Sequence, residues 1–486
     1  MLFIIILLGM TLTVSAGPVL PQEFKFGNNT SIFMCASDVI RVVRGEGKRS
    51  ESLIAKTLFE PFKFSHESKD GETVLTTENV RVVLNESSGH VRFESPDGKN
   101  VLLEESDFDI SQGVTMSWNV EKSEGIYGGG EFQNGFMNFN GAPIELVQYN
   151  TEAVVPFFVS TKGYGILWDS YSWGYLNLPE ETIEFDVSGN STTATFKTSV
   201  AGVYHFLFDG CPNQFGCGFS KTVRMSASNG DTDVEIMDWE ALTNLPDSLL
   251  GRANLQADTE YTLNLTAEGF DQDQNHDFQV FVTRPDFGKM TLQSDIATHI
   301  DYYFTFREFK DIDGAVQGYR KVTGVAPLYN LKVYGFWQCR EHYGTQVELL
   351  NASSQYRERN IPIDWIVQDW KYWPAHNSTE TQEMWGPHWS SDTYPDPEKM
   401  VETLHNQNVN LMVSVWSKFG TSTDFYSQMK SQGFLLGNST YYDPWNPAAR
   451  AEFYAYSKKS MFDIGVDALW YVVLYRLSVR SNITKY

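Results

Sequence analysis

The sequence predicts a multidomain protein in which two β-sheet domains precede the first half of a (β/α)8 barrel. Three observations support this fold class. At 486 residues the chain exceeds the usual size of one domain. From about residue 20 to 285, short apolar runs alternate with turn residues, as in an all-β protein. From about residue 290, strand-like runs alternate with helix-like segments, which is typical of a parallel βα array.

Residues 17–199 are predicted to form an N-terminal β-sandwich. Apolar runs at 80–84, 91–93 and 101–103, with the turn Ser95-Pro96-Asp97-Gly98 between the last two, indicate a meander of antiparallel strands. The glycine clusters at 128–130 and 163–165 are not followed by a helix pattern, so they indicate turns rather than a phosphate-binding loop.

Residues 200–285 are predicted to form a second β module. Tyr261, Leu263 and Leu265 alternate with polar residues, the pattern of a half-buried strand. The following turn, 271–277, has the oxygen spacing that opens a calcium loop. It has His276 in place of the required glycine and Val282 in place of the final glutamate. We therefore expect a solvated hairpin turn there and no metal site.

Residues 286–475 are predicted to form the first half of the barrel. Thr345 with Glu348 forms a capping box, and Asp396-Pro397 and Asn446-Pro447 mark two further helix starts. The intervening runs at 331–337, 363–368, 411–416 and 468–475 are almost continuously apolar, as strands buried on both faces are. Functional residues in such an array lie at the strand C-termini.

Composition and the N-terminus indicate an exported protein. The net charge of −24 argues against a nucleic-acid partner. An apolar run at 2–13 precedes Val14-Ser15-Ala16, so residues 1–16 are predicted to be a signal peptide; the run is too short to be a membrane anchor. Nine Asn-x-Ser/Thr sequons agree with a secreted or lumenal glycoprotein: Asn28, Asn29, Asn85, Asn190, Asn264, Asn351, Asn377, Asn438 and Asn482.

The four cysteines indicate one disulfide and no metal. Cys211 and Cys217 are expected to pair in an oxidising compartment, and Cys35 and Cys339 are expected to be free. Since no histidine or second cysteine pair has ligand spacing, we expect neither a metal nor another cofactor.

A candidate sugar site follows from the strand ends. Sugars are bound by aromatic faces and by carboxylates that accept hydroxyl hydrogen bonds. Asp369, with Trp370 beside it, follows one strand, and Trp337 and Trp416 end two others. These four residues are predicted to contact a sugar.

The residues that hydrolysis requires are incomplete. Cleavage of a glycoside normally uses two carboxyl groups, and Asp369 is the one strong candidate at a strand end. Glu341 is a possible second, but its neighbour Arg340 suggests an ion pair. Asp364, Asp463 and Asp467 lie near helix or strand starts and are interpreted as packing or capping residues.

Several motifs over residues 65–470 resemble glycoside hydrolase family 31, the retaining α-glucosidases and α-xylosidases. They are Tyr127-Gly128-Gly129-Gly130-Glu131 and 156–165, which resemble the family's galactose-mutarotase-like sandwich, and 301–304, Tyr319-Arg320, Thr323-Gly324, 335–338, 395–397 and 443–447, which resemble its barrel. The segment 203–282 is similar to a PA14 module, an insertion linked to carbohydrate contact in some members.

The resemblance implies an α-linked oligosaccharide or glycoside as the partner and hydrolysis of its α-O-glycosidic bonds by a retaining mechanism. It implies that Asp369 contacts hydroxyls in the −1 subsite and that Trp370 shapes that pocket, with less room for a hydroxymethyl arm. α-Xyloside is therefore favoured over α-glucoside.

The resemblance also implies that this chain lacks the catalytic pair. After residues 465–467, the nucleophile position is Val472, and the acid/base position falls beyond Tyr486. Residues 476–486 resemble nothing in the family, so a truncated gene model, a retained intron or a splice variant is expected, and with it an inactive chain. The alternative is a non-catalytic carbohydrate-binding protein that uses its β modules.

Overall fold

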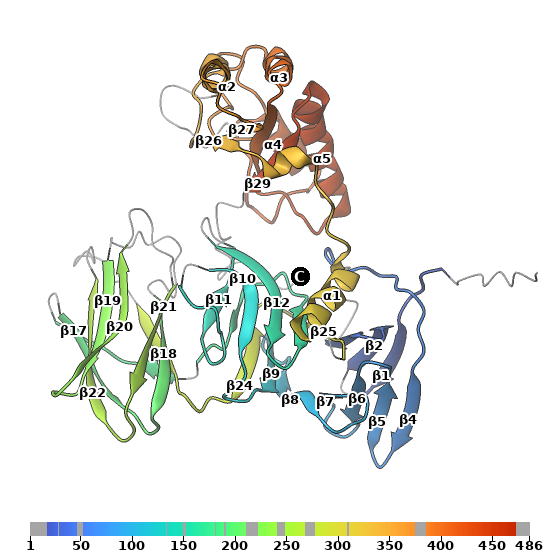
Figure 1. Ribbon diagram of the computed structural model, residues 1–486, viewed down its shortest axis with the longest axis vertical. Coiled ribbons are helices and arrows are strands. Elements are labelled where there is room, and N and C mark those ends of the chain that lie inside the picture. The colour runs from blue at the N-terminus through green and yellow to red at the C-terminus, as the bar shows by residue number, and fades with distance from the viewer. Residues whose placement is uncertain are drawn as a thin grey trace, which may run out of the picture. The chain divides into compact units, whose positions relative to one another are not determined.

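The computed structural model describes residues 17–27, 29–45, 52–132, 134–148, 152–179, 181–188, 191–209, 222–240, 248–267, 278–308, 311–374 and 385–472. The chain divides into two compact units, and the boundary along the chain falls between Ala326 and Pro327 (Figure 1). Unit 1 here means the described residues up to Ala326, and unit 2 those from Pro327 on. The predicted signal peptide (1–16) and the basic tail (476–486) lie outside the described residues.

Two large antiparallel sheets in unit 1 form the predicted N-terminal sandwich. In sheet order, the seven strands described in the first are β1 (Gln22–Phe26), β2 (Thr30–Ala36), β3 (Val39–Arg44), β25 (Ile300–Phe306), β13 (Tyr164–Trp168), β12 (Ala153–Ser160) and β10 (Ile126–Glu131). The nine described in the second are β11 (Ile144–Leu146), β14 (Gly174–Leu176), β24 (Lys289–Ser294), β9 (Val114–Asn119), β8 (Val101–Asp109), β7 (Val91–Glu94), β6 (Arg81–Asn85), β5 (Glu72–Thr76) and β4 (Ser65–Lys69). The predicted meander is confirmed as β6, β7 and β8.

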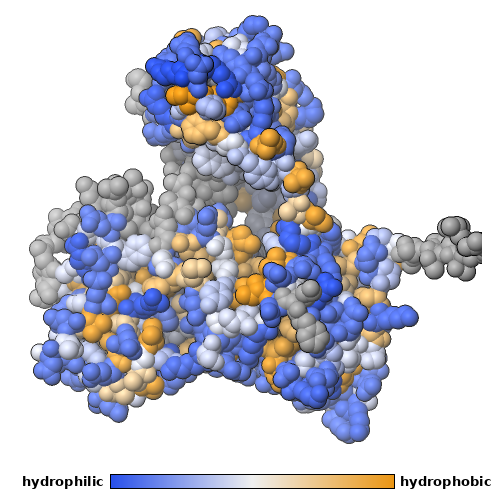
Figure 2. Space-filling model, viewed as in Figure 1, coloured by the Kyte–Doolittle hydropathy of each residue, from blue (hydrophilic) through white to orange (hydrophobic). Residues whose placement is uncertain are grey.

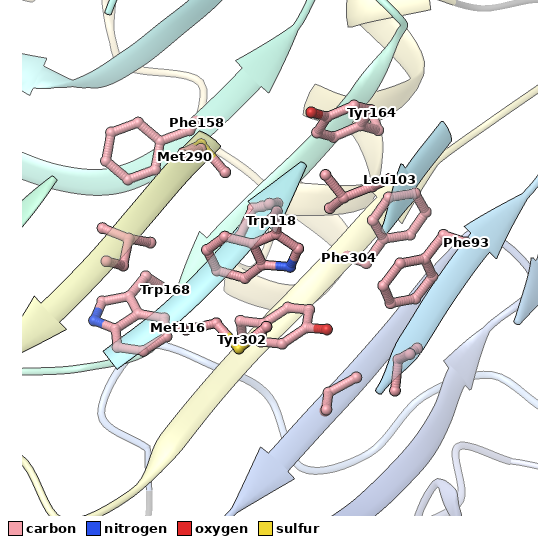
Figure 3. Packing of buried hydrophobic residues seen from close by; sticks show 14 of the residues in the cluster. Phe93, Leu103, Met116, Trp118, Phe158, Tyr164, Trp168, Met290, Tyr302 and Phe304 are labelled. Atoms are coloured by element: carbon pink, nitrogen blue, oxygen red, sulfur yellow. The ribbon is translucent and has the colours of Figure 1, made fainter. Parts of the chain in front are cut away.

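Aromatic side chains from both sheets form the sandwich core. Phe93 on β7 stacks on Phe304 of β25 with ring centroids 3.9 Å apart, and Trp118 of β9 contacts Tyr302 edge to face at 5.2 Å (Figure 3). Each large side chain buried in this way contributes about 2–5 kcal/mol. Alternate residues of the strands supply this core, which is why the period-2 pattern predicted the domain.

The predicted start of the barrel at residue 286 is wrong. β24 pairs with β14 and β9 in one sheet, and β25 pairs with β13 and β3 in the other. Helix α1 (Asp311–Thr323) packs on β13 and β25, with Lys321 bound to Asp38 at 2.7 Å. Residues 286–326 therefore complete the sandwich, and the segment 301–304, whose resemblance was assigned to the barrel, is an interior strand of a sandwich sheet.

The second β module is also a sandwich, and it begins earlier than residue 200. Its described sheets are β15 (Glu181–Ile183), β23 (Gln279–Thr283), β18 (Gly202–Asp209) and β21 (Ser248–Leu255), and β16 (Asp186–Ser188), β17 (Ser191–Lys197), β22 (Glu260–Ala267), β19 (Thr222–Ser228) and β20 (Asp233–Glu240). Since β15, β16 and β17 pair within it, the predicted boundary at 199 moves to about residue 180. The module is an insertion between β14 and β24 of the N-terminal sandwich.

These corrected boundaries predict how fragments of the chain behave. A fragment ending at Ala326 is expected to unfold cooperatively, whereas one ending at residue 285 loses β24 and β25 from the interior of both sheets. The shorter fragment lacks Tyr302, Phe304 and Leu292, each worth about 2–5 kcal/mol, against a usual domain stability of about 5–15 kcal/mol. Near-ultraviolet circular dichroism and thermal melting of the two fragments check this. Equal melting temperatures would refute the boundary.

Unit 2 is a parallel βα array, as predicted. Its described sheet has the order β26 (Trp337–Cys339), β27 (Trp365–Gln368), β28 (Asn410–Trp416) and β29 (Ala468–Val472), all parallel. The helices are α2 (Gln346–Glu358), α3 (Pro397–Asn406), α4 (Asp424–Ser431) and α5 (Pro447–Ser460), with 3₁₀ turns η1 (Leu331–Tyr334) and η3 (Phe462–Ile464).

The helix starts in unit 2 agree with the sequence signals. The side chain of Thr345 accepts a hydrogen bond from the Glu348 amide, Asp396 accepts one from the Lys399 amide, and Asn446 caps α5. Gly465, at φ +97°, ends η3 rather than α5 itself, and so turns the chain into β29.

The first strand of unit 2 was predicted too early. Residues 331–334 form η1, Gly335 follows it, and β26 starts at Trp337, where the predicted strand ended. The carbonyls of Lys332 and Val333 accept hydrogen bonds from the indoles of Trp365 and Trp337, each at 3.0 Å. These two hydrogen bonds stabilise η1, although the composition of residues 331–334 is typical of a strand.

Hydrophobic side chains are exposed where the chain passes from α1 into unit 2, and Figure 2 shows them as an orange stretch. Val325, Leu328 and Leu331 are 86%, 94% and 87% exposed. Within the described part of unit 2, β26 and β29 are the sheet edges, and Trp470 and Tyr471 on β29 are partly exposed as well. We therefore expect unit 2 to aggregate when expressed alone.

Candidate functional site

The strand register of unit 2 decides which side chains share the face of the sheet opposite the helices. Ile366, Leu411 and Val413 pack with α2 and α3 in one core cluster. Because side chains alternate along a strand, residues of the other parity face the opposite side. Ser414 pairs with Trp470, and Trp416 pairs with residue 472. These positions therefore form two successive rows across β28 and β29, near the C-terminal ends of the strands.

Asp369 lies at the C-terminal end of β27 as predicted. The carboxyl is half-buried, and burial raises its pKa above the ordinary value; the negative charge of Glu341 raises it further, while the hydroxyl of Ser414 acts in the opposite direction. Glu341 and Ser414 thus lie close enough to interact with Asp369. An acid with this environment at a strand end is a candidate for substrate contact.

Trp370 is held from two sides. The ammonium of Lys371 lies 4.2 Å from the centroid of its ring, and His342 contacts the ring edge to face at 5.5 Å. Lys371 has φ +68°, a left-handed conformation that is uncommon for a residue other than glycine. Such strained positions cluster at functional sites, and here the turn brings the lysine back over the indole.

Trp416 is the last residue of β28 and belongs to an aromatic cluster. Its ring contacts Trp385 edge to face at 4.6 Å and Trp373 at 5.0 Å. Its Nε1 is buried and has no hydrogen-bond partner among the described residues. Lys418 lies 4.6 Å from the ring of Trp385, and burial lowers the pKa of its ammonium. The cluster therefore places packed aromatic rings and one buried indole donor, unpaired among the described residues, at the C-terminal end of β28.

Trp337 is not at the C-terminal end of a strand, which was the position predicted for it; its contact with substrate stays a prediction. It is the first residue of β26, and its ring stacks on Trp365 at 4.3 Å with an interplanar angle of 3°. With its Nε1 bound to the Val333 carbonyl, this indole is used for packing at the opposite end of the sheet.

The expected ion pair between Arg340 and Glu341 is also wrong. Arg340 pairs with Glu348 on α2 at 2.8 Å. Glu341 is exposed and lies 3.7 Å from Nδ1 of His342. Its carboxylate is thus on the same side as Asp369, although its exposure leaves it well hydrated.

The acids interpreted as structural do have structural roles. Asp364 accepts a hydrogen bond from the Phe336 amide at 2.9 Å, and Asp467 accepts one from the Leu411 amide at 2.8 Å and contacts His405. Asp463 pairs with Lys458.

Sequence reasoning missed Ser414, which lies beside Asp369. A signal was present, because Ser414 is the one polar residue within the apolar segment 411–416. It also missed Trp385, which follows a segment outside the described residues and belongs to no predicted strand.

Two of the four cysteines lie in the described residues. Cys35 is buried and Cys339 exposed, and both are free, as predicted. Cys211, Cys217 and the turn 271–277 lie outside the described residues. In the described ranges, three or more His, Cys, Asp or Glu side chains nowhere gather as a metal site, and none of the helices found there is long and apolar enough to cross a membrane.

A parallel βα sheet with an acid and aromatic rings at its strand ends is the arrangement of a (β/α) barrel domain. Two models of known protein families match parts of this chain. "Glycosyl hydrolase 31 N-terminal galactose mutarotase-like domain" matches residues 29–177, and "Glycosyl hydrolases family 31 TIM-barrel domain" matches 326–471. Together they cover more than half of the chain, which therefore belongs to glycoside hydrolase family 31. Both matches agree with the corrected boundaries.

Relatives and solved structures agree with the family. An α-xylosidase of Saccharolobus solfataricus is 25% identical over 467 residues, which is 92% of this chain and 48% of that protein. An α-xylosidase A of Aspergillus niger is 26% identical over 206 residues, 38% of this chain and 27% of its own. The crystal structure of a family 31 α-xylosidase from Xanthomonas citri has the same fold, with a TM-score of 0.73 at 22% identity, over 94% of this chain and 57% of that one. The chain thus spans about half the length of the first two curated relatives it matches.

Proposed function

We propose that this protein has the substrate site of a glycoside hydrolase for α-O-glycosidic bonds in carbohydrate metabolism, with an α-xyloside as its ligand. The chain that carries Val472 binds this sugar without hydrolysing it. The observation that carries the proposal is Asp369, which lies at the C-terminal end of β27 between Trp370 and Ser414 in a family 31 barrel domain. Its carboxylate would accept hydrogen bonds from two sugar hydroxyls.

Retaining hydrolysis needs two carboxyl groups about 5–5.5 Å apart, one of which forms the covalent glycosyl ester. We assign the position of that nucleophile to residue 472, two residues after Trp470 and in register with Trp416. A valine there offers no oxygen to the anomeric carbon. Asp369 and Glu341 do not replace this nucleophile. The Asp369 carboxylate is assigned to the sugar hydroxyls, and Glu341 is exposed to water.

Binding and turnover are separated by one experiment. Titration calorimetry of the full chain with methyl α-xyloside is expected to show heat of binding, with methyl β-xyloside as the control ligand. An aryl α-xyloside is expected to release no phenol. Absence of α-xyloside binding, or phenol release, would refute the proposal.

The preference for xylose is assigned to Trp370. With Lys371 and His342 on either side of its ring, this indole has little freedom to move away from a hydroxymethyl group. Trp370→Ala is expected to improve α-glucoside binding relative to α-xyloside by about 10- to 200-fold, the usual range for one carbon atom in a tight pocket. Competition calorimetry measures the ratio. Trp445→Ala, at an exposed tryptophan on another loop, is the control and should leave the ratio unchanged.

Two further assignments belong to this proposal. The inserted sandwich is interpreted as a PA14-like module that contacts carbohydrate, and residues 1–16 as a signal peptide that directs the protein to the secretory pathway. Support comes from the position of the module as an insertion and from the apolar run followed by small residues.

A further inference from the structure

A small pocket in unit 2 is built from α4 and the turn that follows it. Its volume is about 280 Å³, and its walls include Tyr426 and Lys430 on α4, Leu435, and Asn438 in the turn. This volume lies just under the range of about 300–1,000 Å³ for small-molecule sites, so the pocket suits a single sugar residue rather than a chain of them.

Asn438 is the first residue of the sequon Asn438-Ser439-Thr440, so the pocket contains its own attachment point. The residue is exposed in a tight turn closed by two hydrogen bonds of 2.9 Å, from the Leu436 amide to the Tyr441 carbonyl and from the Ser439 amide to the Leu436 carbonyl. Gly437, at φ +50°, permits the turn. Among the described residues, the Asn438 side chain has no hydrogen-bond partner.

Two other sequons in the described residues, those of Asn264 and Asn85, are less suited to carry a glycan in the folded protein. Asn264 lies within β22, which is paired on both sides by β17 and β19. The side-chain oxygen of Asn85 accepts hydrogen bonds from the Ser87 amide, the Ser87 hydroxyl and the Ser88 amide.

We propose that Asn438 is N-glycosylated and that its first N-acetylglucosamine occupies this pocket. In the transfer, the Asn438 amide nitrogen bonds to C1 of the sugar and loses a proton, while a polyisoprenyl diphosphate leaves from the lipid-linked oligosaccharide. The proposal rests on the proposed export of the chain and is independent of sugar binding at Asp369.

The pocket walls match the two sides of the sugar. The half-buried ring of Tyr426 offers a flat face for C–H groups. The ammonium of Lys430, 5.6 Å from the centroid of that ring, is placed to donate to sugar oxygens. Both residues lie four apart on α4 and so face the same side of the helix.

The test uses the full chain, secreted behind a heterologous leader from mammalian cells that make only high-mannose glycans, so that export does not depend on residues 1–16 and both glycosidases can act. Mass spectrometry of the peptide containing Asn438 is expected to show the glycan. Endoglycosidase H cuts beyond the first sugar, whereas peptide N-glycosidase F must reach the Asn438 linkage itself. On the native protein, release by peptide N-glycosidase F is expected to be about 3- to 10-fold faster in Tyr426→Leu than in the wild type, the size of one ring contact. Endoglycosidase H rates should be equal.

Tyr454→Leu, at an exposed tyrosine on α5, is the matched control and should behave as wild type. If Tyr426→Leu fails to fold, the wild type alone provides the test. The rate at which peptide N-glycosidase F releases the Asn438 glycan should be several-fold lower in native than in urea-unfolded protein. The same ratio of rates at any occupied sequon on a described exposed loop serves as the reference. An unmodified Asn438, or release at equal rates with and without the tyrosine ring, would overturn the proposal.

Discussion

Arg44→Met is expected to lower the free energy of unfolding of unit 1 by about 3–5 kcal/mol, because it leaves a charged Glu105 in the sandwich core without its cation. The two side chains are fully buried, with Nη2 of Arg44 2.6 Å from Oε2 of Glu105. Glu105 also accepts hydrogen bonds from the Tyr302 hydroxyl at 2.5 Å and the Val91 amide at 2.7 Å. Urea unfolding followed by tryptophan fluorescence measures the loss.

Two variants test the cause of this loss. In Arg44→Met/Glu105→Gln, no unpaired charge is left in the core. The one amide oxygen can accept from the Val91 amide, and the amide NH2 can donate to the Tyr302 hydroxyl, so part of the stability should return. Arg224→Met breaks an exposed pair with Asp238, in which both side chains are nearly half exposed, and should cost no more than about 1 kcal/mol. Equal losses in Arg44→Met and Arg224→Met would contradict the assignment.

Asp369→Asn is expected to weaken α-xyloside binding about 100-fold or more. Two hydrogen bonds to a charged acceptor contribute about 1.5–3 kcal/mol each, and the amide replaces one acceptor oxygen by a donor. Calorimetry measures the change, and Asp364→Asn is the control, since Asp364 binds the Phe336 amide. Unchanged affinity in Asp369→Asn would remove this carboxylate from the site.

The raised pKa of Asp369 adds a pH dependence. Binding requires the charged carboxylate, so affinity should fall as pH decreases through the raised pKa, starting above the ordinary value of 3.8. Stability changes in the opposite sense: because the pKa is raised in the folded state, the contribution of the protonated acid is present at low pH and is lost as pH rises through that pKa. Loss of binding on mild acidification therefore should not come from unfolding through this group, and Asp369→Asn should be as stable as the wild type at neutral pH.

Features that depend on neighbouring residues, such as three helix starts and the end of β27, were predicted correctly from the sequence. The cap residues Thr345, Asp396 and Asn446 start α2, α3 and α5, because a side-chain acceptor is needed wherever a helix leaves its first amides unpaired. The position of Asp369 also followed from the sequence, since it directly follows an apolar run that could only be a buried strand.

Partners distant in the sequence could not be predicted in this way. β25 is fully buried, and nothing in its own residues says whether the neighbouring strands are parallel or antiparallel. The segment 301–304 was therefore assigned, by its resemblance, to the barrel instead of the sandwich. Arg340 lies next to Glu341 in sequence but pairs with Glu348, which α2 brings to it. Trp337 was predicted at the end of its strand and is found at the start, because the residues before it form a 3₁₀ turn instead of a strand.

The most direct test of the central claim is the intact mass of the full chain after incubation with a fluorinated α-xylosyl fluoride, a reagent that leaves its sugar on a catalytic carboxylate. We expect calorimetric binding of α-xyloside and an unchanged mass, because the strand-end position two residues after Trp470 holds Val472. A mass increase of one sugar residue, mapped by proteolysis to any Asp or Glu of this chain, would contradict it.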